Sequence, residues 1–267
     1  MEKASKAQLK KARELMRDRQ ARDAGGLFVA EGLKIVRDMI SKGHVPDPMI
    51  VSRDFAEKEE NKIFLRDAHG RSFPVFETAN ADFEKISSLR HSQGIMAVIK
   101  KPERSGDIPV GEKGAILVLC DGIQDPGNLG AMIRISVAFG AGSMLLAGET
   151  VDIYNPKVIR ASSGMMLDIP VYVCDAAELD RLRKQGYRLL VSQPPEQESE
   201  DITDMTEFPP PVIIAFGSEG KGVSEEISNK ADRFFHVPIR KGVESLNVTA
   251  AAAISLYVFT KSYVAGA

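Results

Sequence analysis

The alternation of short apolar runs with helical segments between residues 114 and 267 constrains the fold more than any other feature of this sequence. The apolar runs contain almost no polar residue and cover residues 115–120, 143–147, 170–174, 187–192, 211–216 and 233–238. Strands that are apolar on both faces are typical of parallel sheets with helices packed on each side. We therefore expect an α/β domain with a mostly parallel sheet, helices near residues 128–139 and 176–185, and a last helix over residues 247–263.

A second, smaller α/β region precedes this one. Residues 1–100 alternate helical stretches at 5–16, 31–43 and 59–70 with apolar runs at 27–30, 49–52, 73–77 and 94–100. Residues 101–113 are rich in Pro, Gly and charged side chains, which is typical of a linker. No apolar run approaches the ~20 residues that a membrane-spanning helix needs, and the charged N-terminus does not resemble a secretion signal.

The charge distribution is uneven, although the formal net charge is only −2. Residues 1–22 carry eight basic and three acidic side chains, a net charge of +5, at helical spacing. Such a segment is either a phosphate-contacting arm or a solvated basic helix, and charge alone does not separate the two. Residues 193–207 hold six acidic side chains and no basic one, and we expect them to form a flexible surface loop.

The two cysteines, Cys120 and Cys174, lie in apolar, strand-like contexts. No cluster of Cys or His surrounds either of them, so neither is expected to bind a metal. We expect buried free thiols in a reducing cytoplasm.

Three strand ends are unusually rich in Gly, Asn, Ser and Glu. Ligands bind beyond the carboxyl ends of the strands in open parallel sheets. After strand 115–120 the chain turns, and Asn128 can cap the next helix. In that helix Arg134 leans back over Gly130 and Ala131, so its guanidinium has room to hold a phosphate or a reacting oxygen. A simple helix cap and a surface salt bridge are the alternative interpretations.

The second strand end is the glycine-rich stretch "GSEGKG" at residues 217–222. Gly217, Gly220 and Gly222 permit positive φ angles and close approach of the backbone to a ligand. The spacing fits neither a phosphate-binding P-loop nor a dinucleotide-binding GxGxxG motif. Glu219, in the middle of the turn, is either solvated or placed to contact a ribose hydroxyl or to orient the preceding arginine.

The third strand end is the exposed loop from Ile239 to Leu246, which carries Ser245. Asn247 can cap the helix that follows. Four alanines at 250–253 allow another backbone or a flat ligand to approach closely, although helix propensity alone also favours alanine.

Taken in order, "DPGNLGAMIR", "GSEGKG" and "VPIRKGVESLNVTAAAA" resemble the three signature motifs of the SpoU (TrmH-type) RNA 2′-O-ribose methyltransferases, within the SPOUT class. The stretch "RDRQARDAGGLFVAEGLKIVRDM" resembles the substrate-binding domain that precedes the catalytic domain in many members. The resemblance covers nearly the whole chain. It implies a smaller N-terminal α/β RNA-binding domain at residues 1–100 and a catalytic domain at residues 114–267 whose parallel sheet contains a deep trefoil knot.

The resemblance also implies ligands and partners. The implied cofactor is S-adenosylmethionine, the active unit is a homodimer in the cytoplasm, and the substrate is RNA, with ribosomal RNA ahead of transfer RNA. By motif position, Gly217, Ile239 and Leu246 line the cofactor pocket, together with Gly220 and Gly222 of the turn. Neither a metal nor a membrane is implied.

Five residues fall on the family's active-site positions, namely Asn128, Arg134, Glu219, Ser245 and Asn247. Methyl transfer to a ribose 2′-OH requires the hydroxyl to lose its proton and to lie in line with the methyl donor. Arginine stays protonated, so we expect Arg134 to stabilise the forming alkoxide rather than to act as a base. We expect the other polar residues to position the ribose and the arginine, with Glu219 holding that arginine.

Four basic residues of the N-terminal region are expected to contact RNA phosphates: Lys10, Arg17, Arg22 and Arg37. Two other classes of function are open at this stage. A non-catalytic RNA-binding or ribosome-assembly factor would keep the fold without needing the whole active-site set, and an oxidoreductase on a doubly wound sheet would need the missing GxGxxG motif. A base-methylating SPOUT enzyme is the nearest rival within the class.

Overall fold

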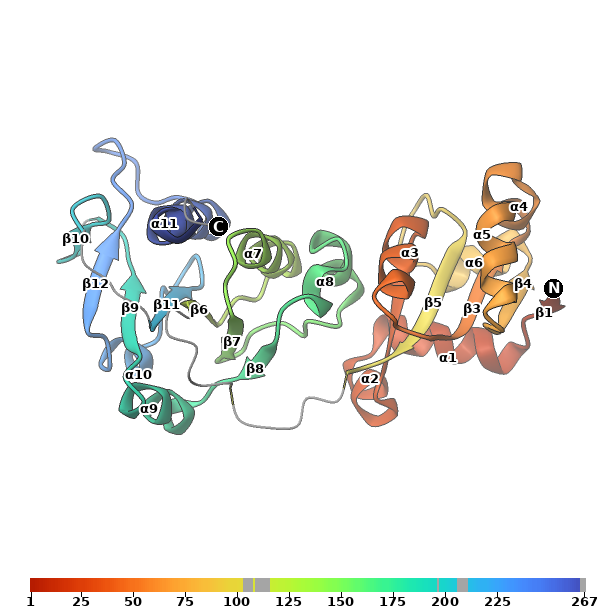
Figure 1. Ribbon diagram of the computed structural model, residues 1–267, viewed down its shortest axis with the longest axis horizontal. Helices are drawn as coiled ribbons and strands as arrows, with labels where there is room; N and C mark the ends of the chain where they lie inside the picture. Colours follow the sequence, from red (N-terminus) through yellow and green to blue (C-terminus); the bar gives the residue numbers. More distant parts are fainter. Residues whose placement is uncertain (103–107, 109–115, 196, 206–210, 265–267) are drawn as a thin grey trace. The chain divides into compact units, whose positions relative to one another are not determined.

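The computed structural model describes the chain except residues 103–107, 109–115, 196, 206–210 and 265–267 (Figure 1). It divides into two compact units. The N-terminal unit comprises Met1–Arg104 together with Tyr154–Gly164, and the C-terminal unit comprises Ser105–Ile153 and Met165–Ala267. A short segment from the second half of the sequence therefore completes the N-terminal unit. The expected linker at 101–113 lies almost entirely outside the described residues.

A five-stranded mixed sheet forms the centre of the N-terminal unit, with strand order β1-β4-β3-β5-β2. Its strands are β1 (Glu2–Lys3), β2 (Leu27–Glu31), β3 (Pro46–Ser52), β4 (Val75–Thr78) and β5 (Ile95–Lys100). The β1–β4 and β4–β3 pairs are parallel, whereas β5 runs antiparallel to both of its neighbours, β3 and β2.

Helices cover both faces of this sheet (Figure 1). They are α1 (Lys6–Arg17), α2 (Arg19–Gly25), α3 (Leu33–Ser41), α4 (Arg53–Glu57), α5 (Glu59–Gly70), α6 (Asn80–Ile86) and α8 (Pro156–Ala161). Leu15 of α1 and Phe83 of α6 pack with Val98 of β5 in one buried cluster. The ring of Tyr154, just before α8, lies 5.1 Å from the ring of Phe28 in β2, which fixes the added segment to the sheet.

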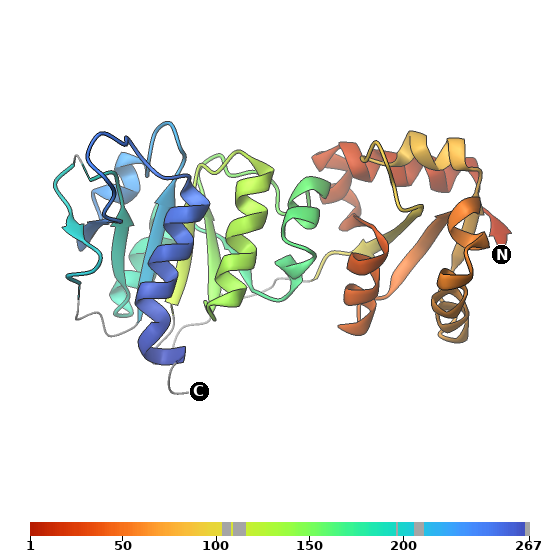
Figure 2. The ribbon, with the colours of Figure 1, turned by 90° about the horizontal axis from the view of Figure 1, so that it is seen from above.

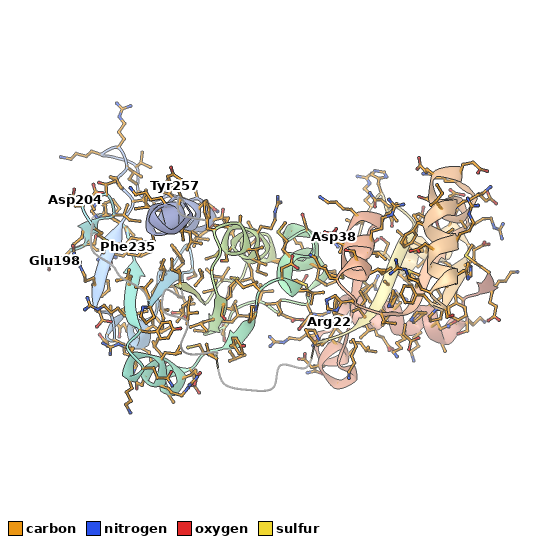
Figure 3. All side chains as sticks on the ribbon, in the orientation of Figure 1. Arg22, Asp38, Glu198, Asp204, Phe235 and Tyr257 are labelled. Atoms are coloured by element: carbon orange, nitrogen blue, oxygen red, sulfur yellow. The ribbon has the colours of Figure 1, made fainter. Side chains whose placement is uncertain are left out.

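The basic N-terminal segment forms α1 and α2 rather than a free arm. Helix α1 begins at a capping box, in which Ser5 and Gln8 each accept the other's backbone N–H through their side chains. Arg22 of α2 is only 3% exposed, and its Nη1 donates to the carbonyl oxygen of Leu15 at 2.7 Å (Figure 3). The expectation that Arg22 contacts RNA phosphate is therefore wrong, because its guanidinium satisfies a carbonyl in the last turn of α1.

The C-terminal unit is built on a seven-stranded sheet with order β10-β12-β9-β11-β6-β7-β8. Its strands are β6 (Ile116–Asp121), β7 (Ser143–Ala147), β8 (Val171–Val173), β9 (Arg188–Ser192), β10 (Glu200–Asp201), β11 (Val212–Gly217) and β12 (Arg233–His236). Every pair of neighbouring strands in it is parallel. The predicted α/β domain with a parallel sheet is confirmed.

Helices cover both faces of this sheet as well. They are α7 (Pro126–Ala138), α9 (Ala176–Lys184), α10 (Glu225–Ser228), α11 (Val248–Val264) and the short 3-10 helix η1 (Met165–Leu167). Helices α7 and α11 run side by side on one face, and α9 and α10 cover the other (Figures 1 and 2). Successive residues of β6 show the division. Leu119 joins the cluster of Leu182 in α9, whereas the Sγ atom of Cys120 lies 3.9 Å from the Sδ atom of Met132 in α7.

The acidic segment 193–207 is not a solvated loop in its described part. Strand β10 lies within it and extends the sheet beside β12. Ile202 and Met205 are buried, and Glu200 forms an ion pair with Arg233 of β12. The expectation of a flexible surface loop is wrong here because two apolar side chains anchor the segment and a basic neighbour balances part of its charge.

Within the described residues, no helix has both the length and the apolar character needed to span a membrane. The same residues contain no group of three His, Cys, Asp or Glu side chains arranged to hold a metal ion. Both cysteines are free and buried, as expected. Burial raises the pKa of Cys120 and of Cys174 to about 12, because a thiolate is disfavoured away from water.

Candidate active site

The loops that follow β6 and β11 meet at one edge of the C-terminal sheet, since the two strands are parallel neighbours. The chain leaves β6 through α7 toward β7 on one side, and leaves β11 toward β12 on the other side (Figure 1). Such a reversal of direction opens a crevice at the carboxyl ends of the strands, where ligands bind in open α/β sheets. The loop between β12 and α11 starts from the same edge, so the three strand ends singled out from the sequence converge here.

Residues 217–222 fold into a tight turn. Ser218 N donates to Gly222 O at 3.1 Å, and Gly222 N donates to Ser218 O at 2.9 Å. Gly222 has a φ of +69°, which side chains rarely permit. A Cβ atom on Gly217 would lie 1.8 Å from the carbonyl carbon of Gly222, so a side chain there would force the turn open. Gly220 does not use the positive φ that a glycine permits, and no atom of the described chain lies within 4 Å of a Cβ added to it.

Asp121, which sequence reasoning passed over, braces this turn. Its side chain is 4% exposed, and its Oδ2 accepts the backbone N–H of Ser224 at 2.7 Å. A Cβ atom on Gly148 would lie 2.7 Å from Oδ1 of Asp121, so the glycine leaves room for the carboxylate. A buried carboxylate needs such a donor. The sequence did indicate this residue, because Asp121 is an acidic residue that directly follows the apolar run 115–120, at a strand end where ligands bind.

Glu219 accepts hydrogen bonds from two side-chain amides, one in each of the other two loops. Its Oε1 accepts from Nδ2 of Asn128 at 2.9 Å and from Nδ2 of Asn247 at 2.7 Å. Nδ2 of Asn247 also lies 3.4 Å from Oδ1 of Asn128. Three residues separated widely in sequence thus form one polar cluster, and the charged acceptor makes these hydrogen bonds stronger than neutral ones.

Helix α7 is capped by Asp125 and not by Asn128. Oδ1 of Asp125 accepts the backbone N–H of Asn128 at 2.9 Å. Pro126 occupies the first helical position, where its missing N–H has no partner to lose. The capping role expected for Asn128 is therefore wrong, and its side chain is left available to Glu219.

Helix α11 does begin after Asn247, as expected from the sequence. Oδ1 of Asn247 accepts the backbone N–H of Thr249 at 2.9 Å. Because that oxygen is engaged, the NH₂ group is the end of the amide that faces Glu219. One side chain therefore caps a helix and also holds the glycine turn, which couples the start of α11 to Glu219.

A cavity of about 260 Å³ lies against one side of the turn. All five residues expected to hold the cofactor line it, namely Gly217, Gly220, Gly222, Ile239 and Leu246. Glu219 and Ser245 of the expected active-site set line it as well. The structure thus brings the residues expected to hold the cofactor, and two of those expected in the active site, to one cavity.

The remaining wall of this cavity comes from the start of the acidic segment, to which sequence reasoning gave no function. Gln193, Pro194, Pro195 and Gln197 line it. The backbone N–H of Gln193 donates to the carbonyl oxygen of Phe235 at 3.0 Å, which holds this wall against β12. The signal was present, since Gln193 directly follows β9 and the same rule on strand ends applies to it.

Arg134 stands apart from the polar cluster. It is exposed on α7, six residues after Asn128, which corresponds to about 9 Å along a helix axis. Among the described residues it forms no hydrogen bond or ion pair, and the partners of Glu219 are the two asparagines. The expectation that Glu219 holds Arg134 is therefore wrong for the single chain.

Three of the four expected RNA contacts are exposed in the N-terminal unit. Lys10 and Arg17 lie on α1, with Lys10 Nζ 3.8 Å from a carboxylate oxygen of Glu14. Arg37 lies on α3, and its guanidinium carbon is 5.3 Å from the centre of an aromatic ring of α5. Arg37 also lines a groove of about 490 Å³ together with Lys34 and Lys58.

The comparisons with known proteins cover both units. The SpoU rRNA Methylase family matches residues 115–257, more than half of the chain, and the MRM3-like substrate binding domain matches residues 6–97. The chain belongs to the SpoU rRNA methylase family. This SpoU chain is 33% identical over 180 residues to the 23S rRNA (guanosine(2553)-2′-O)-methyltransferase RlmP of Bacillus subtilis, across 66% of the chain and 68% of RlmP.

Two further relatives show how far the similarity extends. The mitochondrial rRNA methyltransferase 3 of Mus musculus is 26% identical over 294 residues, which cover 91% of this chain and 69% of the mouse protein. The AdoMet-bound rRNA methyltransferase of Sinorhizobium meliloti superposes with a TM-score of 0.83, over 98% of this chain and 97% of that one, at 23% identity. The last comparison shows the shared fold of both units.

Membership of the SpoU family confirms the enzyme class predicted from the three motifs, an RNA (ribose-2′-O) methyltransferase that uses S-adenosylmethionine. Membership of this family also excludes the alternative that the chain is an oxidoreductase. The trefoil knot implied by the resemblance stays a prediction.

Proposed function

We propose that this SpoU enzyme methylates a ribose 2′-hydroxyl of ribosomal RNA in the crevice beyond β6 and β11. The observation that carries the proposal is the cluster of Glu219, Asn128 and Asn247, which joins three loops at the wall of the 260 Å³ cavity. A protein that only bound RNA would have no need to hold two amides on a carboxylate beside such a cavity.

The chemistry of the cavity fits S-adenosylmethionine. Ile239 and Leu246 offer apolar contact, the glycine turn offers backbone groups, and the carboxylate of Glu219 suits a cationic sulfur. When bound, S-adenosylmethionine supplies an electrophilic methyl group. Gly217 keeps the turn closed, so the wall on which the ligand rests is set by the fold before binding.

The chain's own residues then place the ribose. Asn128 and Asn247 are fixed by Glu219, and Ser245 lines the cavity on which Glu219 lies. Holding the hydroxyl in line with the methyl group can supply about 7–11 kcal/mol of the barrier. We assign Arg134 to the stabilisation of the 2′-alkoxide, since a guanidinium donates without losing its proton.

We propose that the enzyme is a homodimer paired across α7 and α11. Helix α11 exposes Ile254 and Tyr257 at 39% and 59% (Tyr257 is labelled in Figure 3). The ring of Tyr257 lies 6.2 Å from that of Phe139, the residue that follows α7. Arg134 is exposed on the same pair of helices. A second copy covering this face would remove water around Arg134 and strengthen its interaction with developing charge. Tyr257→Asp should give monomers in sedimentation analysis, and a dimeric variant would contradict the pairing.

We further propose that Lys10, Arg17 and Arg37 contact RNA phosphates. Each such contact makes log K fall with log[salt] by about one unit of slope. Replacing all three by Gln should lower the salt slope of RNA binding by about three units, whereas Lys230→Gln, on the other unit and paired with Asp180, should not. An unchanged slope in the triple variant would contradict the assignment.

Ribosomal RNA is the proposed substrate class, because the names of RlmP and of the mouse enzyme both state ribosomal RNA. Transfer RNA is the second candidate. A cytoplasmic location goes with the proposal, since ribosomal RNA is made and processed there in bacterial cells.

The test is transfer of a labelled methyl group from S-adenosylmethionine to unmodified ribosomal RNA and transfer RNA. The wild type should label ribosomal RNA, and Arg134→Ala should lower turnover by about 10²–10³, the usual effect of removing one donor aimed at developing charge. S-adenosylhomocysteine should raise the melting temperature of both proteins. Label found only in transfer RNA would show that transfer RNA, and not ribosomal RNA, is the substrate. Near-wild-type turnover of Arg134→Ala would overturn the role of Arg134.

A further inference from the structure

A second cavity, of about 550 Å³, lies on the other side of the glycine turn. The two cavities share the residues 218–222 and Val248 in their linings. Asn128 lines only the second cavity, whereas Ser245 and Leu246 line only the first. The polar cluster on Glu219 therefore sits between two hollows, which is the arrangement that transfer between two bound molecules requires.

The acidic side chains Asp121 and Asp125 in this second cavity are already engaged. Asp121 accepts the N–H of Ser224, and Asp125 accepts the N–H of Asn128. Both carboxylates thus serve the local fold and have little capacity left for a ligand.

Three other polar side chains lining the cavity are unengaged. Gln124, Glu149 and Lys221 come from the loops after β6, after β7 and after β11. In the described part of the chain none of their side chains forms a hydrogen bond or an ion pair. An amide, a carboxylate and an ammonium group from three loops are thus available to one bound molecule.

The backbone that carries Gln124 and Glu149 is nevertheless firmly tied. Gly122 N donates to Ala147 O at 3.1 Å, and Val151 N donates to Ile123 O at 2.9 Å. The hydroxyl of Thr150 accepts the N–H of Ile123 at 3.2 Å and lies 2.7 Å from the carbonyl oxygen of Ala147. The two loops are thus cross-linked through their backbones, and the fold fixes the positions from which the exposed side chains of Gln124 and Glu149 extend.

A nucleobase matches this set of groups. Single-stranded RNA is recognised by bases that are splayed out and hydrogen-bonded along their Watson–Crick edges. A carboxylate accepts two parallel hydrogen bonds best from adjacent donors, and guanine alone presents two adjacent N–H groups, N1–H and N2–H, on that edge. Adenine and cytosine present a donor beside an acceptor, and uracil presents one donor between two acceptors.

We propose that the second cavity holds the base of the target nucleotide and that Glu149 selects guanine. This rests on the proposed function, because it takes the first cavity as the cofactor site. Gln124 offers an amide to the remaining polar atoms of the base, and Lys221 balances the phosphate of the same nucleotide. Glu149 acts on specificity and does not touch the reacting atoms.

The experiment measures binding of the four nucleoside 5′-monophosphates to the full chain saturated with S-adenosylhomocysteine. Wild type should bind GMP at least tenfold more tightly than AMP, CMP or UMP. Glu149→Gln should lose at least tenfold in GMP affinity and most of the preference, because the amide provides one acceptor instead of two. Glu226→Gln, an exposed carboxylate on α10 outside both cavities, is the matched control and should bind as wild type does.

Equal binding of the four nucleotides, no binding of any, or an unchanged preference in Glu149→Gln would each overturn the assignment. The affinity for S-adenosylhomocysteine is measured beforehand, in a separate titration of each protein. If the wild type did not bind S-adenosylhomocysteine, the proposed function itself would fail. If it bound S-adenosylhomocysteine but showed no preference for GMP, only the assignment of the second cavity to a guanine base would be refuted.

Discussion

Asn247 allows a direct test of the site, because its side-chain amide makes two interactions that can be removed separately. Its oxygen caps α11 through Thr249, and its NH₂ group donates to Glu219 at 2.7 Å. Serine is about as good an N-cap as asparagine, while alanine costs about 1 kcal/mol. Asn247→Ser should therefore keep the cap and lose only the contact with Glu219, whereas Asn247→Ala should lose both.

The expected magnitudes follow from these two contacts. A hydrogen bond to a charged group contributes about 1.5–3 kcal/mol, and the exposure of Glu219 places this one near the lower end. At about 1.36 kcal/mol per tenfold, kcat should fall about tenfold in Asn247→Ser and in Asn247→Ala alike. The melting temperature should be about 2–4 °C lower in the alanine variant than in the serine variant, because only alanine also loses the cap.

Single-turnover methyl transfer and thermal unfolding measure the two effects, with Asn229→Ser, at the C-cap of α10, as control. The affinity for S-adenosylhomocysteine should stay close to that of wild type, because Asn247 does not line the cofactor cavity. A serine variant with wild-type kcat would refute the positioning role. Loss of activity that follows stability alone, in alanine but not in serine, would reduce Asn247 to a helix cap.

Three further outcomes follow from the packing. Gly217→Ala places a methyl group 1.8 Å from backbone across the turn and should abolish cofactor binding in calorimetry, whereas Gly70→Ala, at the end of α5 with open space around it, should bind normally. Arg22→Ala should lower the free energy of unfolding by about 1.5–3 kcal/mol in denaturant titrations and leave the salt slope of RNA binding unchanged, since its guanidinium holds a buried carbonyl. Burial raises the pKa of Cys120 and Cys174 from 9.0 to about 12, so unfolded thiols ionise first and stability should fall as pH rises above about 9. Native protein at pH 8 should accordingly show no fast-reacting thiol with a chromogenic disulfide, and two such thiols in denaturant.

The parallel sheet was predictable because its strands are buried on both faces and leave a continuous apolar signal. Helix 59–70 was equally clear, since its amphipathic spacing ends at a glycine and matches α5. The pairing of β10 was not predicted, because two acidic residues do not suggest a strand. Ile202 and Met205, the buried apolar residues of that segment, were the feature of the sequence that indicated a packed segment.

The sequence predicted which residues come together in the site, but it predicted their contacts less well. The three motifs named Asn128, Glu219 and Asn247, but only the fold shows that Glu219 accepts from both amides rather than holding Arg134. Arg22 illustrates the limit most clearly, because helical spacing and charge are the same for a buried arginine as for an exposed one. Its burial depends on how α2 packs against the end of α1, which is a tertiary property.

In the proposed reaction the methyl group goes to a ribose oxygen in the crevice beyond β6 and β11. The most direct measurement digests ribosomal RNA to nucleosides after reaction and separates 2′-O-methylated from base-methylated products, for wild type and for Glu219→Ala. The wild type should yield 2′-O-methylnucleoside, and the variant should yield much less, because it loses the acceptor that holds both asparagines. A base-methylated product, or full 2′-O-methylation by Glu219→Ala, would contradict the proposed reaction.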